Sequence, residues 1–127
     1  MSDRDCFDFY KSIFPNFDEN KWNTYDFRSY AQVDGEGKII GCLSVIKDHE
    51  FPGVDHIWLC GVNPKYRNQG IFKRLIGMFQ RNCTNEISIA TYPERWPIMY
   101  NWIKKRGELI TEIKGKVLYV IPKDMII

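Results

Sequence analysis

The sequence predicts an α/β fold, in which helices pack on a mixed sheet within a single compact domain. Its length of 127 residues is that of one domain. Segments with helical and with strand periodicity alternate along the chain, and no repeat or linker divides them. Hydrophobic residues make up 44% and charged residues 27%, which is typical of a globular protein. We therefore expect one domain over residues 1–127.

Three segments carry apolar residues at helical spacing. The first ends at Pro15, because proline cannot donate a hydrogen bond within a helix. The second begins at Gly70 and keeps its cations away from its apolar face. The third begins at Pro97, which suits a first helical turn, and stops at Gly107. Residues 16–27 are rich in aromatic residues without a clear period, so we expect them to be irregular or partly helical.

Strand patterns fill the intervals between these helices. The pair Asp34-Gly35 predicts a hairpin turn, because a positive φ is cheap for glycine. Residues 56–62 form an apolar run of strand length, with Pro52-Gly53 before it and Asn63-Pro64 after it. The expected order is α-β-β-β-α-β-α-β-β, over residues 5–14, 30–33, 38–46, 56–62, 70–83, 86–91, 97–107, 109–113 and 117–121.

Charge and composition argue against several classes of protein. The net charge of +2 is too small to indicate a nucleic-acid or membrane partner, and nucleotide-binding signatures are absent. We expect a cytoplasmic location, with a nuclear one left open, because no membrane span or signal segment stands out. We expect no metal site, because the cysteines lie far apart in the sequence and histidines are few. The residues concerned are Cys6, Cys42, Cys60, Cys83, His49 and His56.

The most informative segment is residues 62–76, where a buried strand ends, a turn follows and a helix begins at a glycine. Such a junction directs unpaired N–H groups and the positive end of the helix to one spot, where an anion binds. Gly70 lets the backbone approach bound phosphates closely. The residues that define the pattern are Val62, Pro64, Tyr66, Arg67 and Gly70.

This segment resembles the acyl-CoA-binding motif of the GCN5-related N-acetyltransferase (GNAT) superfamily, at the junction of that fold's fourth strand and third helix. The order of elements matches over residues 28–121. The resemblance implies a GNAT-like N-acetyltransferase domain that transfers an acetyl group from acetyl-CoA to a primary amine. The acceptor would be a small amine, an amino sugar, or a protein lysine or N-terminus. Phe72 departs from the family, which usually has Gly or Ala there, and its side chain is expected to turn into the core.

The resemblance also implies where acetyl-CoA binds. The N–H groups of residues 67–72 would cradle the pyrophosphate, and residues 60–62 would pair with the pantetheine arm where strands four and five splay. Lys65 or Lys73 would reach the 3′-phosphate, or would simply be solvated. The cofactor-binding candidates are Cys60, Gly61, Val62, Arg67, Asn68, Gln69, Gly70, Ile71 and Phe72.

His56 is the candidate general base. It stands six residues before Val62, where one branch of the family has a catalytic glutamate, and a two-residue period would place it on the face of Trp58, Cys60 and Val62. An imidazole with a pKa near ~6.5 suits this task. The alternatives are a histidine satisfied at a strand edge, and an amine that loses its proton to water alone. A backbone N–H near Val62 would hold the oxyanion.

Tyr100 is the candidate general acid. The family often has a tyrosine four residues before the glycine that ends its fourth helix, but here that position, relative to Gly107, holds Ile103. Tyr100 lies one turn earlier on a similar face, and packing against the sheet is the alternative role. Cys60 as an acyl-carrying nucleophile is a weaker hypothesis than a buried structural cysteine.

Three questions stay open at this point. Because the usual tyrosine is missing, a non-catalytic acyl-CoA-binding module, acting as a sensor or scaffold, is the alternative to an enzyme. Nothing in the sequence selects between a monomer and a homodimer. The residues that could line an acceptor groove, or equally close the core, are Trp22, Tyr25, Phe27, Tyr92 and Trp96.

Overall fold

The computed structural model describes residues 3–14, 17, 19–24, 27–47, 54–82, 86–122 and 124. Its elements are α1 (Asp3–Ile13), α2 (Glu19–Thr24), β1 (Phe27–Val33), β2 (Ile39–Lys47), β3 (Val54–Val62), the 3₁₀ turn η1 (Pro64–Tyr66), α3 (Ile71–Asn82), β4 (Glu86–Thr91), α4 (Pro97–Lys104), β5 (Glu108–Ile113) and β6 (Lys116–Ile121). Within the described ranges no helix combines the length and the hydropathy needed to cross a membrane.

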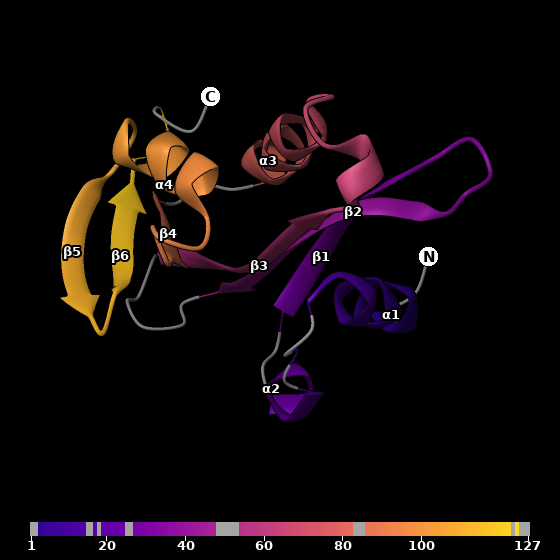
Figure 1. Ribbon diagram of the computed structural model, residues 1–127, viewed down its shortest axis with the longest axis horizontal. Coiled ribbons are helices and arrows are strands. Elements are labelled where there is room, and N and C mark those ends of the chain that lie inside the picture. The colour runs from indigo at the N-terminus through magenta and orange to yellow at the C-terminus, as the bar shows by residue number, and fades with distance from the viewer. Residues whose placement is uncertain are drawn as a thin grey trace.

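A six-stranded mixed sheet runs through the molecule in the order β1-β2-β3-β4-β6-β5. Only β3 and β4 are parallel neighbours, and the other pairs are antiparallel. Helices α1 and α2 lie on one face of the sheet, whereas α3 and α4 lie on the other (Figure 1). This arrangement confirms the predicted mixed α/β fold.

One detail of the N-terminal part differs from the prediction. The first strand begins at Phe27 and not at Tyr30, whereas the helix α2 at residues 19–24 agrees with the expectation of a partly helical aromatic segment. The earlier start of the strand has a tertiary cause, because Phe27 packs on Trp22 of α2 with ring centroids 4.3 Å apart. Periodicity along the chain does not report such a contact between neighbouring elements.

The sheet separates two apolar cores. The smaller core lies under α1 and consists of Cys6, Phe9, Tyr10, Ile39 and Cys42. The larger core lies under α3 and α4 and consists of Ile40, Leu43, Val45, Ile57, Ile71, Leu75, Ile76, Phe79, Ile87, Ile89, Ile103, Val117, Tyr119 and Ile121.

Tyr10 attaches α1 to the sheet. Its side chain is fully buried, and its hydroxyl forms a hydrogen bond of 2.8 Å with the Ser44 hydroxyl. The same hydroxyl lies 3.4 Å from the carbonyl oxygen of Leu59 on β3. Burial raises the pKa of Tyr10 well above its ordinary value, so the phenol stays neutral. The end of α1 is thereby held over β3.

Strand β3 contains a β-bulge at Trp58. Its pairing with β2 runs Ser44↔Leu59 and then Val45↔Ile57, so Trp58 is the extra residue on the bulged strand. The Trp58 ring packs in the direction of α2, and Leu59 belongs to the small core under α1. Two consecutive side chains therefore point to the same face of the sheet.

The bulge corrects the expectation that His56, Trp58, Cys60 and Val62 share one face. Cys60 and Val62 pack against the core under α3 and α4. His56 pairs with Ile46 on the α1 and α2 side, where the Trp58 ring also lies. A two-residue period fails across a bulge because the inserted residue reverses the alternation.

Strands β3 and β4 separate after a short paired section. They pair from Val54↔Glu86 to Ile57↔Ile89. Beyond this point β3 continues along β2 as far as Val62, whereas β4 continues along β6 as far as Thr91. The last residues of β3 thus have no strand on one side, and a gap opens in the sheet.

Gly41 on β2 allows α3 to pack closely beside this gap. A Cβ atom at Gly41 would lie 2.6 Å from Cγ2 of Ile71, the first residue of α3, and 3.3 Å from Cδ1 of Leu75. We expect Gly41→Ala to lower the free energy of unfolding by about 1–3 kcal/mol, because the helix must move to admit the methyl group. Chemical denaturation measures this difference.

Gly35→Ala is the matched control, since a Cβ atom at Gly35 in the hairpin turn meets no atom within 4 Å. Both changes restrict the unfolded chain equally. Equal stabilities of the two variants would show that the helix tolerates the added group at Gly41.

Candidate active site

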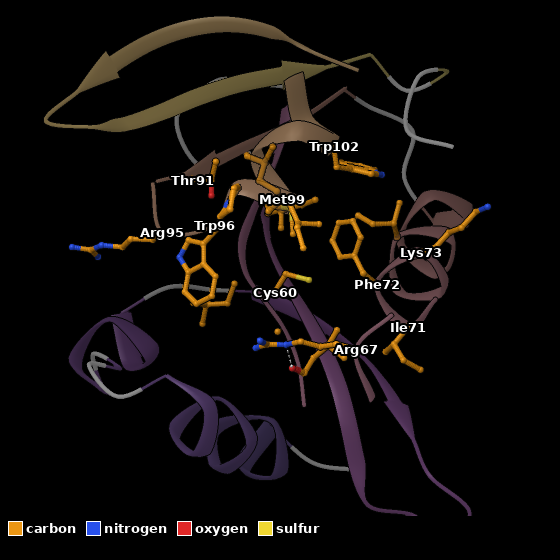
Figure 2. A pocket seen from close by; sticks show the side chains of 18 of the residues that line it. Cys60, Arg67, Ile71, Phe72, Lys73, Thr91, Arg95, Trp96, Met99 and Trp102 are labelled. Carbon is orange, nitrogen blue, oxygen red and sulfur yellow. Dashed lines mark hydrogen bonds between the residues drawn. The ribbon is translucent and has the colours of Figure 1, made fainter. Parts of the chain in front are cut away.

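The gap between β3 and β4 opens a cavity of about 970 Å³ (Figure 2). Its wall takes residues from both strands, from α3 and α4, and from the end of α1. Because the strands separate, side chains from both faces of the sheet reach it. Cys60 and Val62 come from the face under α3, whereas Trp58 comes from the face under α1 and α2. The cavity therefore connects the two faces of the sheet.

The turn after β3 is held rigidly by Asn63. The Asn63 side chain accepts a hydrogen bond from the Lys65 N–H at 3.0 Å, and its carbonyl accepts one from the Tyr66 N–H at 2.8 Å. The N–H of Asn63 donates to the Ile40 carbonyl on β2 at 2.8 Å. The start of α3 is thus fixed relative to the sheet.

A row of unpaired backbone N–H groups lies between this turn and the first bonded turn of α3. The N–H groups of residues 68–73 have no acceptor within the described part of the chain, and the Arg74 N–H is the first to bond, to the Gly70 carbonyl at 3.1 Å. Asn68 and Gly70 have positive φ angles of 65° and 77°. A Cβ atom at Gly70 would meet nothing within 4 Å, so the space in front of it is open. This geometry suits an anion such as a pyrophosphate.

The backbone N–H of Arg67, unlike those of residues 68–73, faces a carbonyl oxygen. This N–H points to the Pro64 carbonyl at 3.5 Å, and the Arg67 Nε donates to the Val62 carbonyl at 3.3 Å. The guanidinium group therefore lies across the end of β3 within the cavity wall (Figure 2).

Phe72 lies at the border between the core and the cavity. Its ring packs edge-on against Trp102 of α4, with centroids 5.1 Å apart (Figure 2). The side chain is only partly buried, so it does not turn fully into the core as expected from the sequence. The contact between Phe72 and Trp102 instead connects α3 to α4 at the cavity wall.

The cavity wall is rich in positive charge. No Asp or Glu contributes to it among the described residues, and its cations are Arg67, Lys73, Arg95, Arg106 and Lys116. Arg106 is held in place by Trp102, because its guanidinium lies 4.5 Å from the centre of that ring and donates to the Trp102 carbonyl at 3.1 Å. Lys65 lies outside the cavity wall. The charge favours a ligand that carries several anionic groups.

Neither candidate for proton transfer lines the cavity. His56 lies opposite Ile46 of β2 on the α1 and α2 face of the sheet, and its Nδ1 is 2.8 Å from the Ser88 hydroxyl on β4. The Tyr100 ring packs against Tyr119 of β6, with centroids 6.3 Å apart. Their catalytic roles remain predictions, and His56 would need an intervening water to reach a group in the cavity.

Cys60 lines the centre of the cavity, and burial raises the pKa of its thiol to about 12. A thiol with this pKa stays protonated at neutral pH and is a poor nucleophile. This agrees with a structural role. No group of three or more His, Cys, Asp or Glu in the described ranges could hold a metal ion.

The aromatic candidates for the acceptor groove divide into two groups. Trp22 and Phe27 pack against Trp58 and help to close the core on the α1 and α2 side. Tyr92 and Trp96 line the cavity. Tyr25 lies outside the described residues.

Several residues of the wall were not identified from the sequence. Ile13 and Phe14 come from the end of α1, and Trp102 and Arg106 come from the end of α4. Arg106 belongs to a basic cluster that is typical of any helix end, so charge alone could not distinguish it. The others are apolar residues at helical spacing, a pattern that predicts burial and not a cavity wall.

The mixed sheet parts beside the start of α3, and this fold is shared with solved acetyltransferase structures. The chain belongs to the acetyltransferase (GNAT) family, whose model matches residues 2–96. This confirms the resemblance carried by residues 62–76. Membership of the family implies acetyl transfer from acetyl-CoA.

Solved structures with this fold come from plants and bacteria. NAA60 from Arabidopsis thaliana, in complex with a bisubstrate analogue, has a TM-score of 0.67 at 20% identity, with 91% of this chain and 88% of that chain covered. The same protein in complex with acetyl-CoA has a TM-score of 0.64 at 18% identity, with 91% and 89% covered. An IAA acetyltransferase from Bacillus cereus has a TM-score of 0.70 at 14% identity, with 88% and 91% covered. No curated protein matches the sequence significantly.

Proposed function

We propose that the protein transfers the acetyl group of acetyl-CoA directly to the nitrogen of a primary amine. The observation that carries this proposal is the cavity at the gap between β3 and β4, which connects the two faces of the sheet. An acetyl thioester that enters beside α3 and an amine that enters beside α1 would meet there. Two reactants held in one cavity gain the rate advantage of proximity.

The residues of this chain fit acetyl-CoA in three places. The unpaired N–H groups of residues 68–73 suit its pyrophosphate. The free edge of β3 at residues 60–62 suits the amide groups of its pantetheine arm, because that edge has no strand beside it. Lys73 and Arg106 lie in the same wall and suit its 3′-phosphate.

The reaction needs one proton to leave the amine and one to reach the sulfur of CoA. His56 remains the candidate base, acting through water from the α1 and α2 face. For the acid, the hydroxyl groups in the described cavity wall are nearer candidates than Tyr100, and they belong to Tyr66, Thr91 and Tyr92. A His56→Ala variant that keeps full turnover would leave water as the base.

Direct transfer predicts that the enzyme needs no acetyl-cysteine. Burial raises the pKa of the Cys60 thiol to about 12, so the thiol stays protonated at neutral pH. We expect Cys60→Ala to keep turnover within about threefold of the wild type, measured as CoA release from acetyl-CoA over a panel of amines. We also expect labelled acetyl-CoA alone to leave no label on the wild-type protein.

Three outcomes separate the hypotheses. Label on the wild type that disappears in Cys60→Ala would show a covalent route and overturn direct transfer. Acetyl-CoA binding without CoA release for any amine would favour the non-catalytic module. CoA release together with an N-acetylated product, identified by mass, would support the proposal.

A further inference from the structure

The half of the cavity away from α3 is lined by side chains that the binding of acetyl-CoA does not explain. We call this half the acceptor mouth, and it consists of Ile13, Phe14, Tyr92, Arg95 and Trp96. Figure 2 shows Arg95 and Trp96 at the opposite end of the cavity from Ile71 and Lys73, with Cys60 between them. A ligand group bound beside Arg95 and Trp96 therefore lies away from the start of α3, where the pyrophosphate would bind.

The loop between β4 and α4 holds the acceptor mouth in place. The Tyr92 carbonyl accepts hydrogen bonds from the N–H groups of Arg95 at 3.0 Å and of Trp96 at 2.9 Å, which closes a compact turn. Pro97 then begins α4. The two side chains therefore project from a turn with a defined shape.

Arg95 is oriented by stacking and not by a carboxylate. Its guanidinium carbon lies 4.6 Å from the centre of the Tyr92 ring, so the planar group lies over the ring and keeps its N–H edges available. No ion pair of Arg95 occurs within the described ranges. On the α1 and α2 side, Glu19 is already paired with Lys11 at 2.7 Å.

Aromatic side chains lie near the Arg95 guanidinium group in the acceptor mouth. Trp96 is 45% exposed although it lines the cavity, and its ring meets Phe14 edge-on with centroids 6.5 Å apart. An exposed tryptophan beside an apolar helix end provides a surface on which a flat or apolar body can lie. The acceptor mouth thus combines one available cation with apolar contact area and, among the described residues, no anion.

We propose that the acceptor mouth selects an amine that also carries a carboxylate or a phosphate, on an apolar or planar body. Arg95 would pair with the anion through two parallel N–H groups, and Trp96 and Phe14 would contact the body. Within the acceptor mouth, a polyamine or a lysine side chain in a basic peptide would meet the like charge of Arg95 and no lining carboxylate. This inference rests on the proposed function, and it narrows the class of acceptor.

The reaction balances for such an acceptor. The amine nitrogen forms a bond to the acetyl carbon, the thioester carbon–sulfur bond breaks, and the amine gives up one proton while CoA leaves as the thiol. The anionic group takes no part in bond making. Its pairing with Arg95 would fix the position of the amine, so Arg95 would be a residue that determines specificity.

Matched pairs of amines test this proposal. The rate of CoA release is measured with phenylalanine against phenylalaninamide, with O-phosphotyrosinamide against tyrosinamide, and with spermidine. We expect kcat/KM to be about tenfold or more higher for the anionic member of at least one pair, as is usual for a charge-assisted hydrogen bond. The first pair reports a carboxylate and the second a phosphate.

Arg95→Gln should remove that advantage and leave the KM for acetyl-CoA unchanged. Arg81→Gln is the matched control, because Arg81 is exposed in the last turn of α3 and outside the cavity wall. Equal rates for both members of each pair, or a loss in Arg95→Gln that affects both members equally, would overturn the inference while leaving the proposed function intact.

A failure of the proposed function would look different. If no amine releases CoA, the binding of N-acetylphenylalanine and of its amide to the protein in the presence of CoA still tests the acceptor mouth. Tighter binding of the carboxylate form that depends on Arg95 would support the site. Equal binding of the two forms would overturn it.

Discussion

Gly70→Asp is expected to abolish the stabilisation of this protein by acetyl-CoA. A ligand at about 100 times its Kd adds about 2.7 kcal/mol to the free energy of unfolding, which raises the Tm of a domain of this size by several degrees. In the variant a carboxylate would stand where the unpaired N–H groups of residues 68–73 face the pyrophosphate. Melting curves with acetyl-CoA, CoA, ATP and NAD measure the effect.

Gly37→Asp is the control for this change. Gly37 has a φ of 82°, close to the 77° of Gly70, and a Cβ atom at either position meets no atom within 4 Å. Aspartate tolerates this backbone conformation better than most residues, so both variants should fold with similar intrinsic stability. Equal acetyl-CoA shifts in Gly37→Asp and Gly70→Asp would mean that the start of α3 does not hold the pyrophosphate.

Ile103→Ala is expected to have the largest effect on stability. Ile103 is fully buried in the core between α4 and the sheet. Removing its side chain leaves a cavity, and such changes lower the free energy of unfolding by about 2–5 kcal/mol. This is a large share of the stability of an ordinary domain, and urea denaturation measures it.

Ile98→Ala on the same helix is the matched control. Ile98 is 82% exposed, so its truncation should change stability by less than about 0.5 kcal/mol. Both substitutions replace the same residue in α4 and alter helix propensity alike. If the two variants unfolded at the same urea concentration, the packing of α4 on the sheet would contribute little to stability.

The strand-turn-helix junction between β3 and α3 could be predicted from the sequence because its determinants are local. Asn63, Pro64 and Gly70 act through turn geometry within a few residues, and the apolar face of α3 follows a short period. The order of strands and helices followed from the same kind of pattern. These features need no knowledge of distant contacts.

The position of the catalytic candidates could not be predicted in this way. The bulge at Trp58 depends on the pairing of β3 with β2, and it moved His56 to the other face from Cys60 and Val62. The spacing of Tyr100 to Gly107 does not report that its ring packs against Tyr119. The position of Arg95 in the cavity wall depends on the end of α1 and the loop after β4 sharing one cavity, which no local pattern predicts.

The parting of β3 and β4 leaves a narrow strand-to-strand connection between the two halves of the sheet. Among the described residues, the strand pairing between the half that carries α1 and α3 and the half that carries α4 covers four residue pairs, from Val54↔Glu86 to Ile57↔Ile89. A rocking of one half against the other about these pairs would widen or narrow the cavity while each half kept its own strand pairing. Across the gap Phe72 contacts Trp102 and Phe14 contacts Trp96, so such a motion would change both aromatic contacts.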